Sequence, residues 1–75
     1  MISNRLRVLR AERRWSQAEL ARRVLVSRQT IVALENERFQ PTLQLSFRIV
    51  HVFGTTIEDV FTADPEDLAL VDTGA

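Results

Sequence analysis

The chain has 75 residues, with ten basic side chains balanced by ten acidic ones, and no cysteine. This length allows one compact domain and leaves no room for a separate sensor or catalytic domain. Without cysteine there are no disulfides, thiolate zinc sites or thiol nucleophiles, and an intracellular compartment is the simplest expectation. No apolar run approaches the length of a membrane span, so we expect a cytoplasmic protein with no membrane partner.

The zero net charge conceals a division along the chain. All ten basic residues are arginines between Met1 and Arg48, where only four glutamates oppose them. The other six acidic residues all follow Arg48. A basic front and an acidic rear orient a molecule toward polyanions, so the neutral total does not exclude a nucleic-acid partner.

Apolar residues at helical spacing predict the first helix. Ile2, Leu6 and Leu9 share one side of a segment rich in arginine, which indicates an amphipathic helix over about residues 4–13.

The motif Ser16-x-x-Glu19 predicts the start of a second helix at residues 17–24. In such a capping box the serine hydroxyl accepts the glutamate amide, and the glutamate side chain returns to the serine amide. Trp15 and Leu20 stand at the two positions of a hydrophobic staple, so we expect Trp15 to be structural.

Ser27 predicts the cap of a third helix over residues 28–36, with Ile31 and Leu34 facing inward. Two short helices separated by three or four residues have the spacing of a helix-turn-helix.

Further periodic segments predict a fourth helix at residues 42–53 and a short fifth helix at 57–61. The expected fold is therefore all-α, with one domain at residues 1–61. The remainder, residues 62–75, is interpreted as an acidic C-terminal tail.

The string SQAELARRVLVSRQTIVALENE (Ser16 to Glu37) resembles the core motif of the Cro and phage-repressor helix-turn-helix family, often called Xre-type. The string PTLQLSFRIVHVFGTTIEDVF (Pro41 to Phe61) is similar to the last two helices of its small single-domain members. The resemblance implies a compact five-helix, lambda-repressor-like domain whose third helix lies in the DNA major groove. Leu25 and Glu37 stand where the family commonly has glycine. Because a leucine at positive φ costs about 1–2 kcal/mol, we expect a slightly different turn.

The third helix supplies the expected readers of DNA sequence, which are Arg28, Gln29, Val32 and Ala33. Arginine pairs with the O6 and N7 atoms of guanine, glutamine pairs with adenine, and small apolar side chains touch a thymine methyl. A solvated polar face is the alternative interpretation.

Five residues around this helix are interpreted as phosphate contacts: Gln17, Ser27, Asn36, Arg38 and Gln40. An amide side chain at a helix N-terminus favours a phosphate oxygen, and the resemblance implies this contact for Gln17. A plain N-cap explains Ser27 equally well, and a solvated loop explains Gln40.

The resemblance also implies a structural ion pair between Arg10 and Glu35, which would hold the third helix against the first. His51 has no second histidine or cysteine, so we expect no metal site and no cofactor.

Phe47, Val50 and His51 lie off the main apolar stripe of the fourth helix. Together with Phe61 they predict a dimer interface. A broader core within one chain is the alternative.

These features predict a homodimeric regulator, most simply a repressor, that binds double-stranded DNA at a palindromic operator, with no small-molecule effector. A protein-interaction module such as an antitoxin or adaptor is the alternative, with Leu68, Leu70 and Val71 of the tail as contacts. An enzyme is excluded because no acid, base and nucleophile converge.

Overall fold

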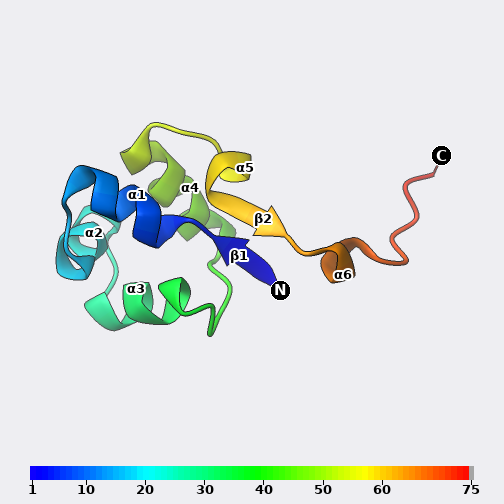
Figure 1. Cartoon of the computed structure of the whole chain (residues 1–75), viewed down its shortest axis with the longest axis horizontal. Helices are drawn as coiled ribbons and strands as arrows, with labels where there is room; N and C mark the ends of the chain where they lie inside the picture. The colour runs from blue at the N-terminus through cyan, green and yellow to red at the C-terminus, as the bar shows by residue number, and fades with distance from the viewer. Residues whose placement is uncertain (75) are drawn as a thin grey trace.

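Helices occupy the five segments that periodicity and capping predict (Figure 1). The computed structural model describes residues 1–74. The elements in chain order are β1 (Ile2–Asn4), α1 (Leu6–Arg13), α2 (Gln17–Val24), α3 (Arg28–Glu35), α4 (Leu43–Phe53), α5 (Ile57–Val60), β2 (Phe61–Ala63) and α6 (Pro65–Leu68). The predicted all-α helix-turn-helix fold is confirmed, and the two strands and α6 add to it. No helix of residues 1–74 is long and apolar enough to cross a bilayer.

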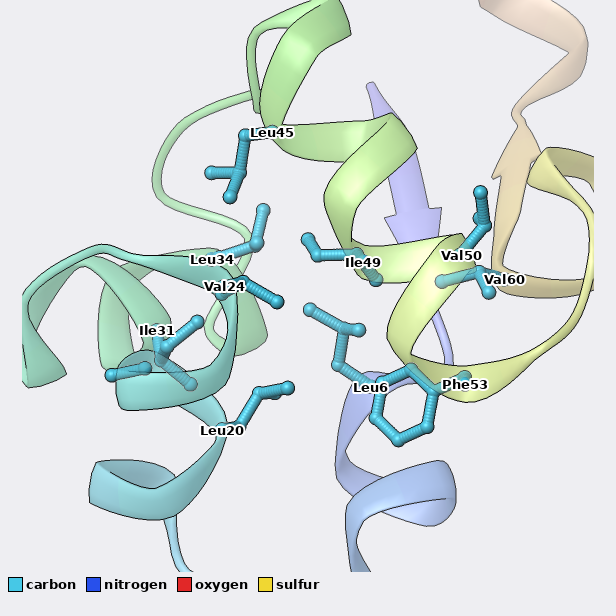
Figure 2. Close-up of a cluster of buried hydrophobic side chains, with 11 residues drawn as sticks. Leu6, Leu20, Val24, Ile31, Leu34, Leu45, Ile49, Val50, Phe53 and Val60 are labelled. Atoms are coloured by element: carbon cyan, nitrogen blue, oxygen red, sulfur yellow. The ribbon is translucent and has the colours of Figure 1, made fainter.

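The core lies where α1 to α5 converge (Figure 2). Seven side chains are fully buried, and every one of these five helices contributes: Leu6, Leu20, Val24, Ile31, Leu34, Ile49 and Val60. The inward positions predicted for α2 and α3 are therefore confirmed. Because apolar burial is the main favourable term in folding, this cluster fixes how α2 and α3 sit on the rest of the domain.

A hydroxyl side chain caps the start of each of the helices α2 to α5. The caps are Ser16, Ser27, Thr42 and Thr56, each accepting the amide three residues on. The predicted capping box at α2 is only half formed, because Glu19 pairs with Arg22 and Arg23 instead of returning to the serine amide.

The first and last parts of the domain meet in a two-stranded antiparallel sheet. Ile2 lies opposite Ala63 and Asn4 lies opposite Phe61. Ile2 therefore belongs to a strand and not to the first helix, which begins at Leu6. Residue 61, where the sequence places the end of the domain, lies inside β2.

The turn between α2 and α3 is left-handed at a leucine. Leu25 has φ 66° and ψ 41°, which is the conformation that glycine adopts without steric cost. The expectation of a different turn is therefore wrong, and Glu37 likewise has a positive φ of 57°. Since Leu25 is 73% exposed, burial of its side chain does little to offset this strain.

Replacing Leu25 with glycine should stabilise the protein by about 1 kcal/mol, because glycine takes this φ without the Cβ clash. Urea denaturation followed by circular dichroism measures the change. The matched control is Ala18→Gly on the exposed side of α2, which should destabilise by about 1 kcal/mol. A Leu25→Gly variant less stable than the parent chain would show that the leucine makes a favourable contact.

Candidate functional site

Helix α3 is anchored by its apolar residues and exposes its N-terminal end. Ile31 and Leu34 are buried, whereas Arg28 and Gln29 in its first turn are exposed. Val32 and Ala33 are half-buried. Within residues 1–74 Arg28 has no ion pair and no side-chain hydrogen bond, so its guanidinium donors are available to a ligand.

The C-terminal end of α3 carries a buried carboxylate that three side chains contact. Arg10 donates from Nε to Glu35 Oε2 at 2.8 Å and from Nη2 to Oε1 at 3.1 Å. Gln17 Nε2 donates to the same Oε1 at 3.1 Å, and Arg7 Nε lies 3.7 Å from it. The two residues that the resemblance pairs are thus brought together, and residues of α1 and α2 both hold α3 through one side chain.

This network determines the ionisation of Glu35. The carboxylate is 0% exposed, and burial acts to raise its pKa. The hydrogen bonds from Arg10 and Gln17 and the positive charges of Arg10 and Arg7 outweigh burial, so the pKa of Glu35 lies below its ordinary value. The hydrogen bond to Glu35 in turn raises the pKa of Arg10. Both groups are therefore charged at neutral pH.

Stability should consequently fall in acid, and Glu35→Gln should remove part of that fall. Because the pKa of Glu35 is lower in the folded chain, its contribution is complete above the ordinary value of 4.5 and is lost as pH falls through the folded pKa. Urea denaturation at pH values from 7 down to 3 tests this. The stability difference between the parent chain and Glu35→Gln should shrink with falling pH. A constant difference would contradict the prediction.

The expected phosphate contacts differ in what they already bind. Ser27 caps α3, and Asn36 Oδ1 accepts a hydrogen bond from Arg7. The side-chain amide of Gln17 donates to Glu35. Arg38 is exposed and has no ion pair in the described chain.

Gln40 has a structural role that its sequence position does not indicate. Its Oε1 accepts from the Ile2 amide at 2.8 Å, and its Nε2 donates to the Ile2 carbonyl at 3.3 Å. Both halves of the amide are therefore occupied in pairing the loop with β1. This corrects the phosphate interpretation of Gln40.

The predicted dimer surface on α4 is smaller than expected. Val50 is only 7% exposed and lies beside Val60 in the core (Figure 2). Its assignment to an interface is therefore wrong, because the apolar stripe of α4 is wide enough to include it. Phe61 is half-buried against the core, whereas Phe47 is 57% exposed and His51 is exposed.

Asn4 is a positioning residue that sequence reasoning misses. Its Nδ2 donates to the carbonyl of Leu34 at 2.9 Å, and its Oδ1 accepts the amide of Leu6 at 3.2 Å. One side chain of β1 thus binds both the first amide of α1 and a carbonyl near the end of α3. An asparagine just before a helix is the only signal in the sequence.

Arg13 and Arg23 are a second feature missed from the sequence. Their guanidinium groups lie 5.3 Å and 4.2 Å from the ring centre of Trp15. Arg13 also donates to the carbonyls of Val52 and Phe53 at the end of α4. Trp15 is structural, as predicted, and the arginines around it stabilise the junction of α1, α2 and α4.

No group of three or more His, Cys, Asp or Glu side chains in residues 1–74 is arranged to hold a metal ion. The N-terminal end of α3, the loop after it, the outer side of α4 and the segment after β2 are exposed to solvent.

Comparisons with known proteins agree with this geometry. A helix-turn-helix family model matches residues 6–60. An uncharacterised HTH-type transcriptional regulator of Archaeoglobus fulgidus is 45% identical over 64 residues, which are 85% of this chain and 90% of that protein. A regulator of the same description, YgzD of Bacillus subtilis, is 36% identical over 66 residues, 88% of this chain and 100% of its own. A crystal structure from Bacteroides fragilis, provisionally named a DNA-binding protein, has a TM-score of 0.73 at 22% identity and covers 83% of this chain and 100% of its own.

Proposed function

The chain belongs to the Cro/C1-type helix-turn-helix family of transcriptional regulators, and from this premise we propose that it is a repressor that occupies a palindromic operator as a dimer. It is a DNA-binding regulator and not an enzyme. A repressor of this kind acts on DNA in the cytoplasm, and we propose that compartment. In this proposal the protein's own concentration or a partner protein sets its activity.

The observation that carries the proposal is the solvent exposure of the side chains in the first turn of α3. Arg28 and Gln29 are exposed there, while Ile31 and Leu34 hold the helix from behind. A helix presented in this way enters the major groove with its first residues against the base edges. Arg28 binds a guanine, Gln29 binds an adenine, and the smaller Val32 and Ala33 follow along the groove wall.

Phosphate contacts on both sides of α3 would fix its register. Gln17 and Ser27 precede it at the starts of α2 and α3, and Asn36 and Arg38 follow it. Contacts to phosphate position a protein without reading sequence. Gln17 supports the proposal further, because Glu35 already orients its side chain before DNA arrives.

Two copies are needed to read two half-sites about one helical turn, roughly 34 Å, apart. Phe47 and His51 on the outer side of α4, with the exposed part of Phe61, form the proposed contact between copies. Phe47 is exposed one turn after the exposed Leu43 on α4. Adjoining exposed apolar side chains favour a contact surface.

Arg28→Ala should weaken binding to the operator by about 1–3 kcal/mol and relax the preference at one base pair. Selection of sites from random DNA, followed by titration on the selected site and single-base variants, measures both. Gln17→Ala is the matched comparison, because loss of a phosphate contact should weaken all sequences alike. An Arg28→Ala protein with unchanged base preference would remove Arg28 from the reading surface.

Salt dependence separates this proposal from a protein-interaction module. Affinity for DNA should fall steeply between about 50 and 200 mM salt, because phosphate contacts release counterions. A contact through the apolar tail would change little over that range. Arg22→Ala is the control, since Arg22 pairs with Glu19 on α2 and its loss should leave the slope unchanged. A flat profile would favour the protein-interaction function.

A further inference from the structure

The segment after β2, residues 64–74, is an arm that leaves its own domain. Figure 1 shows it running away from the helices, and the chain measures 43 Å along its longest axis against 24 and 20 Å along the others. The N-terminal ammonium group of Met1 binds the first residues of this segment, at 2.7 Å from Asp67 Oδ1 and 3.4 Å from Asp64 Oδ2. The start of the arm is therefore held beside β1.

The arm is both apolar and acidic, and its apolar side chains have no cover. Leu68, Leu70 and Val71 are all exposed, with Leu70 entirely so. Glu66 and Asp72 stand on either side of them and pair with no basic group in residues 1–74. Three large apolar side chains on one short segment indicate a contact surface.

The outer face of α4 has the complementary chemistry. It consists of Leu43, Gln44, Phe47, Arg48 and His51, of which the last four line a shallow open hollow. Leu43 and Phe47 are exposed and apolar. Arg48 is the only arginine or lysine after Arg38 and pairs with no carboxylate among the described residues.

We propose that the arm of a second copy docks on the outer face of α4, and that the two copies exchange arms. Leu68, Leu70 and Val71 cover Leu43 and Phe47, and the carboxylates of the arm approach Arg48. Charge complementarity selects this occupant, because apolar side chains bordered by acids match an apolar face bordered by a cation. The exchange is reciprocal, as a two-fold symmetric dimer requires. The inference deepens the proposed function, on whose dimer it rests.

Sedimentation equilibrium of the full chain over a wide concentration range tests the arm. The arm variant Leu70→Ser/Val71→Ser and the face variant Arg48→Glu should each raise the dimer dissociation constant about tenfold or more, because each removes apolar cover or the charge match. Leu25→Ser is the matched control, an exposed leucine outside both surfaces, and should leave that constant unchanged. Circular dichroism confirms that each variant is folded.

A mixing experiment then shows that the contact runs between copies. The arm variant retains an intact face and the face variant retains an intact arm, so their mixture should form heterodimers more tightly than either variant dimerises alone. Absence of any preferred heterodimer would overturn the exchange. Unchanged dimerisation of the arm variant would overturn the inference while the proposed repressor stands, with α4 then packing directly on its partner. A monomeric parent chain that binds single half-sites would overturn both.

Discussion

The carboxylate of Glu35 is the group on which the placement of α3 depends. It is removed from water and charged, and it is satisfied by Arg10 and Arg7 of α1 and by Gln17 of α2. Removing one partner of a buried ion pair lowers the stability of a protein by more than the intact pair contributes to it, because the remaining charge is left without compensation. The packing of α3 on α1 and α2 must therefore keep all three donors in reach, which allows this helix one position rather than a range of positions.

Hydrogen bonds at both ends of α3 and buried apolar side chains between them also hold this helix in the domain. Ser27 caps its start, and Asn4 binds the carbonyl of Leu34 near its end. Between these points Ile31 and Leu34 enter the core. Its inward side chains and both ends are thus engaged within the domain, and its outward side chains are the ones left for a ligand. A site held in this way does not need to be ordered when DNA binds, which lowers the entropy lost on association.

The sequence predicts α2 to α5 well because two local signals agree at each of these four helices. A hydroxyl cap precedes four helices, and the apolar spacing of 3.6 residues continues from it. It does not predict the sheet, because strands of three residues carry no periodic pattern and these two pair across almost the whole chain. The role of Gln40 was missed for the same reason: its partner, Ile2, lies 38 residues away. The sequence assigns Val50 to an interface because its spacing does not show how wide the buried side of α4 is. That side includes Val50.

The distribution of arginines explains how a chain of zero net charge can still present positive charge to DNA. Much of the basic front serves the fold, since four of its arginines reach acceptors within the domain: Arg5, Arg7, Arg10 and Arg13. Two more, Arg22 and Arg23, pair with Glu19. Arg28 and Arg38 are left at the two ends of α3, where the described chain offers them no carboxylate. The net charge therefore says little about partners, because the field that a polyanion meets depends on which charges the fold leaves uncompensated.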